Sequence, residues 1–144
     1  LIEGIENSGK PTIVYYFGDH LPRLGYPKDI YEVYYKTGYL EKGVTAENTE
    51  DLKLFNTQVA KWSNYKKMNA FDKPVSAFYL AYDILEESKV EMPLYYSIYP
   101  KLMEEYPVLS SKNKEKLEGN SELLRDYKLL QYDILFGNGY ILEE

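Results

Sequence analysis

Hydrophobic positions along the chain fall into two short apolar runs and several stretches with helical spacing. The first run, residues 12–17, is continuous and rich in β-branched and aromatic side chains, and Gly18 ends it. A run of this kind is typical of a strand buried on both faces, as in a parallel sheet covered by helices. A second candidate strand lies around residues 58–62.

Helical spacing is clearest in the second half of the chain. Pro74 suits the first turn of a helix whose apolar positions continue to residue 85, and residues 93–106 also keep an apolar side. Ser121 is a suitable N-cap for a last helix, which we expect to end at Gly137. These signals predict three helices.

The first half of the chain is less regular. Residues 1–9 have the pattern of a helix end closed by Gly9. Residues 28–40 fit either a short helix or a strand, and the polar residues 41–53 fit a surface loop. Asn64, in a Trp-Ser-Asn-Tyr stretch, is expected to stabilise a turn through its own backbone.

Together these elements predict an α/β fold with a partial sheet and packed helices, in one domain spanning residues 1–144. A helix tail that leads directly into a buried strand resembles a piece from inside an α/β domain. We therefore expect the N-terminal part of the same domain to lie outside this chain.

Composition narrows the possible partners. The net charge of −6, without a stripe of Lys and Arg, argues against a nucleic acid. Apolar runs are too short for a membrane segment, and cysteine is absent. The 17 tyrosines suit packing at the edge of a core, or stacking on sugars at a surface.

Candidate chemistry begins where the first apolar run ends, at Gly18, Asp19 and His20. In open α/β sheets, ligands bind beyond the carboxyl ends of the strands. A carboxylate and an imidazole are suitable ligands for a divalent ion such as Zn²⁺ or Mn²⁺, although a complete site needs at least three or four ligands. From spacing alone, a single His after a strand is more often a loop residue that bonds to the backbone than a metal ligand.

The stretch from Lys10 to Pro22 resembles the late metal-binding strand of sulfatase domains of the lipoteichoic-acid-synthase type, in the alkaline phosphatase superfamily, where a hydrophobic strand ends in Gly-Asp-His. The resemblance continues in order over nearly the whole chain. It includes residues 35–39, 56–57, 61–65, 109–110, 124–133 and 136–137.

This resemblance implies the C-terminal portion of a metal-dependent phosphoglycerol transferase, in which Asp19 and His20 are metal ligands. The metal implied is Mn²⁺ or Zn²⁺, or else Mg²⁺ or Ca²⁺. An early acidic ligand and a nucleophilic Thr are expected upstream of this chain, since Thr12 and Thr37 match only by residue type. Arg23 is a candidate for binding a phosphate oxygen, or a solvated loop residue.

We therefore expect this chain to be inactive alone and to belong to an enzyme at the extracellular face of the bacterial cell membrane. Upstream helices would anchor that enzyme, and its substrate would be a lipid or polyol phosphate. Sulfate or phosphate ester hydrolysis is a related alternative. A different class of function is a stand-alone tyrosine-rich module that binds a cell-wall polymer or sugar.

Overall fold

The computed structural model describes residues 1–22, 31–113, 117 and 121–142. Contacts divide the chain into two compact units, Leu1–Met68 and Asn69–Glu144. Helices and a small sheet make the fold class α/β, which confirms the class expected from the pattern. The assignment of residues 1–144 to a single domain stays a prediction. No helix among the described residues is long and apolar enough to cross a membrane.

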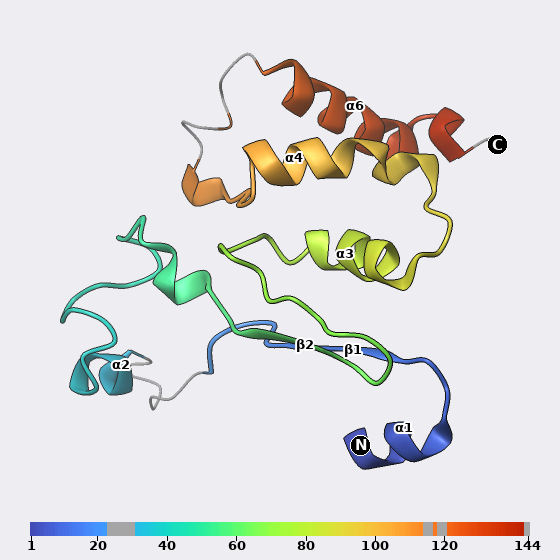
Figure 1. Ribbon diagram of the computed structural model, residues 1–144. Helices are drawn as coiled ribbons and strands as arrows, with labels where there is room; N and C mark the ends of the chain where they lie inside the picture. The colour runs from blue at the N-terminus through green and yellow to red at the C-terminus, as the bar shows by residue number, and fades with distance from the viewer. Residues whose placement is uncertain (23–30, 114–116, 118–120, 143–144) are drawn as a thin grey trace. The chain divides into compact units, whose positions relative to one another are not determined.

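The first unit contains the sheet, which has two antiparallel strands in the described residues (Figure 1). Helix α1 (Ile2–Ser8) ends at Gly9, whose φ of 64° is the left-handed conformation of a helix cap, as expected. Strand β1 (Ile13–Phe17) follows and pairs with β2 (Val59–Ser63).

The setting of β1 differs from the parallel, doubly buried strand that its apolar run indicated. Its one partner among the described residues runs antiparallel, and Tyr16 at the end of the strand is 77% exposed. An apolar run marks a strand, but it contains no information about the direction of the neighbouring strand. That direction follows from the path of the chain between the two strands.

Two side chains hold the ends of this strand pair together. At the start of β1, Asn64 accepts a hydrogen bond from the Thr12 amide (2.8 Å) and donates one to the Lys10 carbonyl (2.8 Å). The expectation that Asn64 stabilises a turn through its own backbone was therefore wrong. At the other end, Thr57 donates from its hydroxyl to the carbonyl oxygen of Gly18 at 2.6 Å.

Short helices and turns make up the rest of the first unit. Residues 28–40, left open between helix and strand, contain helix α2 (Glu32–Lys36) in their described part. The polar stretch of residues 41–53 consists of turns and irregular chain, as expected of a loop, and it runs into the short 3-10 helix η1 (Leu52–Phe55). Asp51 caps η1 by accepting a hydrogen bond from the Lys53 amide.

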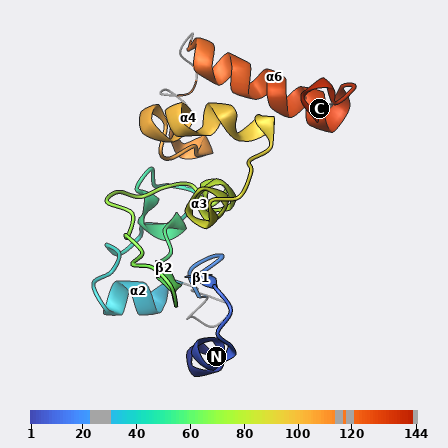
Figure 2. The ribbon, with the colours of Figure 1, turned by 45° about the vertical axis from the view of Figure 1, so that its right-hand side comes forward.

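The second unit is helical in its described part. Figures 1 and 2 show α4 between α3 and α6. In chain order its elements are α3 (Tyr79–Ser88), η2 (Leu94–Ile98), α4 (Tyr99–Glu105), η3 (Ser111–Asn113), α6 (Glu122–Phe136) and η4 (Tyr140–Leu142).

Helix α3 begins later than its sequence suggested, so the placement of Pro74 in its first turn was wrong. The preceding residues are tied to a neighbouring loop. Ser76 donates its backbone N–H to the carbonyl of Pro107 (2.8 Å), and its hydroxyl accepts a hydrogen bond from the Leu109 amide (2.9 Å). These bonds hold the segment against residues 107–109 until the helix begins.

The last helix has the ends that the sequence predicts. Ser121 accepts a hydrogen bond from the Leu124 amide, and α6 ends before Gly137. A β-carbon at Gly137 would lie 2.7 Å from the Cα atom of Asp133, so only glycine fits there. The Asp133 carboxylate then accepts hydrogen bonds from the amides of Gly139 (3.2 Å) and Ile141 (3.1 Å), which folds the chain end back.

The core of the second unit is built largely from tyrosines. Tyr79 and Leu102 are completely buried, and Tyr82, Tyr99, Leu124 and Tyr127 surround them. Tyr99 meets the ring of Tyr79 edge-on, with centroids 5.9 Å apart. The Tyr79 hydroxyl reaches the carbonyl of Tyr106 at 2.8 Å. Because such rings bury apolar area while their hydroxyls find partners at the periphery, packing accounts for much of the tyrosine content.

Candidate functional site

Asp19 and His20 follow β1 directly and lie at the protein surface. Their side chains are 83% and 72% exposed, respectively. The end of β1 thus presents both groups to solvent rather than burying them in the core. Their position after the strand agrees with the sequence-based expectation, whereas their role as metal ligands stays a prediction.

A hydrogen bond to the backbone defines which ring nitrogen of His20 holds a proton. Nδ1 of His20 lies 2.9 Å from the carbonyl oxygen of Leu21. A carbonyl oxygen only accepts, so Nδ1 must be the donor. In the neutral ring, Nε2 is then left with a free lone pair. Metal-binding histidines commonly show this arrangement, with the second nitrogen bonded to a backbone carbonyl or carboxylate.

The carboxylate of Asp19 is oriented toward this free nitrogen. Its Oδ1 accepts a hydrogen bond from the backbone amide of His20 at 2.8 Å, and its Oδ2 lies 3.4 Å from Nε2 of His20. Two acceptors that face each other in this way are suitably placed to share a proton or a metal cation. A proton on Nε2 would form an exposed ion pair, which contributes little to stability.

The observed separation also suits a metal ion. Two ligand atoms at about 2.1 Å from a tetrahedral ion lie roughly 3.4 Å apart, and Oδ2 and Nε2 are 3.4 Å apart. Carboxylate oxygen and imidazole nitrogen are the donors that Zn²⁺ and Mn²⁺ accept. The pair therefore fits half of a divalent site in both donor type and spacing.

The remaining ligands do not come from the described residues. Among the described residues, no group of three or more His, Cys, Asp or Glu side chains is placed to hold a metal ion. Two protein ligands leave most coordination positions to water or to groups from another part of a larger protein. The chain thus fits the implied metal only as a contributor of Asp19 and His20.

Gly18, which directly precedes the pair, is held by Thr57 and Gln58, the two residues ahead of β2. The Gly18 amide donates to the carbonyl of Gln58 at 3.3 Å, and its own carbonyl accepts from the Thr57 hydroxyl at 2.6 Å. A β-carbon at Gly18 would lie 3.2 Å from Cβ of Thr57, so the glycine allows the close approach of Thr57. Sequence reasoning missed Thr57, because a threonine ahead of a strand gives no signal of a bond to a residue 39 positions away.

The other site residues suggested by sequence are not brought into this arrangement. The Thr12 hydroxyl donates to the Lys10 carbonyl, and the Thr37 hydroxyl donates to the Val33 carbonyl. Neither hydroxyl is bonded to a group that would act as its base. Arg23 lies outside the described residues.

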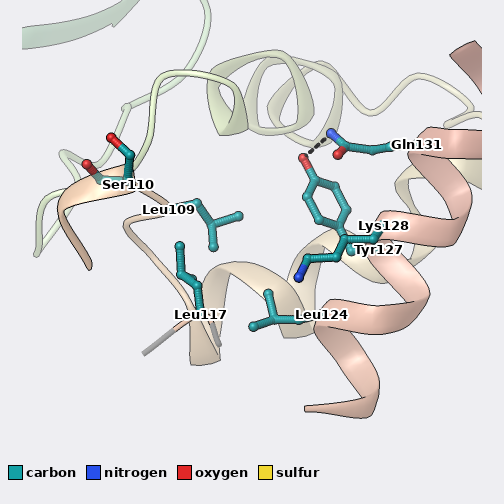
Figure 3. A pocket seen from close by; sticks show the side chains of 8 residues that line it. Leu109, Ser110, Leu117, Leu124, Tyr127, Lys128 and Gln131 are labelled. Carbon is teal, nitrogen blue, oxygen red and sulfur yellow. Dashed lines mark hydrogen bonds between the residues drawn. The ribbon is translucent and has the colours of Figure 1, made fainter. Parts of the chain in front are cut away.

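The second unit has a cavity of about 260 Å³, shown in Figure 3. It is lined by Leu109, Ser110, Ser111, Leu117, Leu124, Tyr127, Lys128 and Gln131. Three leucines face its interior, the Lys128 side chain extends over it, and Gln131 donates to the Tyr127 hydroxyl at 2.7 Å. These described lining residues include no carboxylate, histidine or cysteine, so they provide no usual metal ligand in the cavity.

A second hollow lies on the outer side of α6, near the end of the chain. It has a volume of about 490 Å³ and is lined by Asp126, Leu129, Leu130, Asp133, Tyr140 and Ile141. Tyr140, in η4, is exposed, and so are Tyr132 and Phe136 near the end of α6. The described lining thus combines the ring of Tyr140 with the carboxylates of Asp126 and Asp133.

Comparison with known proteins shows sequence similarity to a protein that is much longer than this chain. Over 158 aligned positions, which cover 99% of this chain, the sequence is 31% identical to a cyclic β-1,2-glucan modification protein of Rhizobium meliloti (strain 1021). The chain spans 24% of that relative. No family model matches the chain. No solved structure matches it either. In this relative, therefore, the matching region is one part of a much longer protein.

Proposed function

We propose that this chain is the C-terminal portion of a sulfatase-type, metal-dependent transferase of phosphoglycerol, or of a related phospho-alcohol, in the bacterial cell envelope. The observation that supports it most is the pair formed by Asp19 and His20. Oδ2 and Nε2 face each other at 3.4 Å, and Nδ1 is bonded to the Leu21 carbonyl. This tautomer and this spacing fit a tetrahedral divalent ion shared by the two side chains.

In this proposal the chain supplies two ligands, and the longer protein supplies the others together with the nucleophilic Thr. When bound, the metal polarises a phosphate oxygen and favours ionisation of a hydroxyl. Asp19 contributes a negative charge to the site. The Leu21 carbonyl holds the His20 ring with Nε2 outward, and the exposed position of both groups leaves them open to a larger partner surface.

The name of the relative suggests an acceptor. A glucan presents sugar hydroxyls, and transfer of phosphoglycerol to one of them is a reaction that modifies a glucan. Such a transfer breaks the bond between phosphorus and the leaving oxygen of the donor. Over the whole reaction a bond forms from phosphorus to the acceptor oxygen, and the proton of the acceptor hydroxyl ends on the leaving oxygen of the donor. The sequence similarity to the Rhizobium meliloti protein supports a glucan as the acceptor. Anchoring of the longer enzyme at the extracellular face of the bacterial cell membrane is part of the same proposal.

The test uses the longer protein that contains this chain, supplied with Mn²⁺, a phospholipid with a phosphoglycerol head group, and cyclic β-1,2-glucan. Mass spectrometry of the glucan should show added phosphoglycerol. Asp19→Asn and His20→Gln should each abolish the addition, while Glu3→Gln, at an exposed carboxylate on α1, should leave it unchanged. Transfer that persists with both ligands replaced would refute the proposal.

A second candidate is a module that binds polysaccharide without catalysis. The outer hollow of α6 favours it, because Tyr140 offers a ring while Asp126 and Asp133 offer acceptors for sugar hydroxyls. Calorimetry of this chain with cyclic β-1,2-glucan separates the two. Binding that is lost in Tyr140→Ala supports the module. A negligible heat of binding in both the unchanged chain and the Tyr140→Ala variant supports the enzyme.

A further inference from the structure

We infer that Thr57 is a positioning residue for the metal-binding pair, acting through the carbonyl group of Gly18. This inference rests on the proposed function, since it assigns a role within the same site. Thr57 itself touches neither Asp19 nor His20 in the bonds described above. Its hydroxyl donates to the Gly18 carbonyl at 2.6 Å, and that carbonyl belongs to the peptide unit that begins Asp19.

Three hydrogen bonds in succession fix the geometry of the pair. The first, from Thr57, sets the plane of the peptide between Gly18 and Asp19. The second, from the His20 amide to Oδ1 of Asp19, sets the carboxylate. The third, from Nδ1 of His20 to the Leu21 carbonyl, sets the ring. The second and third bonds join adjacent residues. They therefore form whatever the orientation of this segment, and they do not fix the pair relative to the rest of the fold.

The first bond is therefore the one that relates the pair to the rest of the fold. It joins residues 39 positions apart and lies next to the ladder bond from the Gly18 amide to the Gln58 carbonyl. The close packing of Thr57 on Gly18 has the same effect, because a β-carbon on Gly18 would lie 3.2 Å from Cβ of Thr57. Exposed side chains such as Asp19 and His20 have few other contacts to hold them.

Because the chain contains a single histidine, the ring of His20 is a direct reporter of metal binding. Mn²⁺ is paramagnetic and broadens the proton NMR signals of a ring that it approaches. We expect Thr57→Ala to need roughly tenfold more Mn²⁺ for the same broadening, the scale seen when groups that orient metal ligands are removed. Thr57→Ser keeps the hydroxyl and should restore the original titration.

Thr37→Ala is the matched control, since the Thr37 hydroxyl also donates to a carbonyl in the same unit, that of Val33. Fluorescence of Trp62, the only tryptophan and a residue of β2, reports whether the strand pair stays folded. If Thr57→Ala titrates like the unchanged chain, or if Thr37→Ala weakens binding equally, the positioning role is refuted.

Asp19→Asn separates this inference from the proposed function. If Asp19→Asn removes the broadening while Thr57→Ala does not, the metal-binding pair stands and only the role of Thr57 fails. If the broadening of His20 survives Asp19→Asn unchanged, the pair is not a metal site, and the proposed function fails with the inference.

Discussion

Alkaline pH should unfold the unit from Asn69 to Glu144, because its core is built on tyrosines that must stay neutral. Burial is the main cause that raises the pKa of Tyr79, Tyr82, Tyr99 and Tyr127 above the usual value near 10. For Tyr82 burial, followed by the hydrogen bond to Glu86, raises the pKa to about 12. All four side chains are at most 8% exposed.

The sign of the effect follows from proton binding in the two states. Above pH 10 an unfolded tyrosine has lost its proton, whereas the folded one still holds it until the pH passes its raised pKa. Stability is therefore complete below pH 10 and falls as the pH rises. Each such tyrosine costs about 1.4 kcal/mol per pH unit, so four cost up to about 5.5 kcal/mol per pH unit. A domain at the lower end of the usual range of about 5–15 kcal/mol should then unfold at roughly pH 11, and a more stable one at a higher pH, where Tyr82 stops contributing once the pH passes its pKa of about 12.

Circular dichroism and tyrosinate absorbance, recorded together against pH, measure this directly. Unfolding and the appearance of the last tyrosinates should coincide. Tyr99→Phe removes one titrating group and should reduce the slope of stability against pH by about a quarter, although it costs about 1 kcal/mol at neutral pH through the lost bond to the Tyr95 hydroxyl. If all tyrosines ionise while the helices persist, the tyrosines are not holding their protons in the core and the reasoning is wrong.

Three further outcomes are expected. Gly137→Ala should destabilise the chain by about 1–3 kcal/mol in denaturant unfolding, because its β-carbon would meet the backbone of Asp133, whereas Gly4→Ala, in open space on α1, should be neutral or stabilising. Asn64→Ala should lower stability by about 1–3 kcal/mol and speed amide hydrogen exchange at Thr12, since it leaves two backbone groups just ahead of β1, the Thr12 amide and the Lys10 carbonyl, without their partner. The chain alone should not hydrolyse a chromogenic phosphodiester. Turnover by the chain alone would contradict the proposal that the nucleophile and the other metal ligands come from another part of a longer protein.

Local signals in the sequence predicted much of the secondary structure. Gly9 and Ser121 occupy the cap positions that their residue types indicate, and the run that ends at Gly18 is a strand. Such signals depend on the backbone preferences of residues that are adjacent in the sequence, so they can be read without knowing the rest of the fold. Pro74 failed because a contact with a distant loop, made by Ser76, overrode a local preference.

Long-range pairing was the part that sequence did not predict. The antiparallel partner of β1, the bridging role of Asn64 and the bond from Thr57 all join residues about 40 to 50 positions apart. The position of Asp19 and His20 after the strand followed from pattern, whereas the orientation of their side chains depended on bonds that only the structure reveals.

The most direct test of the central claim is a calorimetric titration of this chain with Mn²⁺. With Asp19 and His20 as its two protein ligands, the chain should bind with a dissociation constant on the order of a millimolar, and binding should weaken as the pH falls because a protonated imidazole cannot ligate. His20→Ala should abolish it, since the chain has no other histidine. Micromolar affinity that survives His20→Ala would place the metal elsewhere and contradict the account.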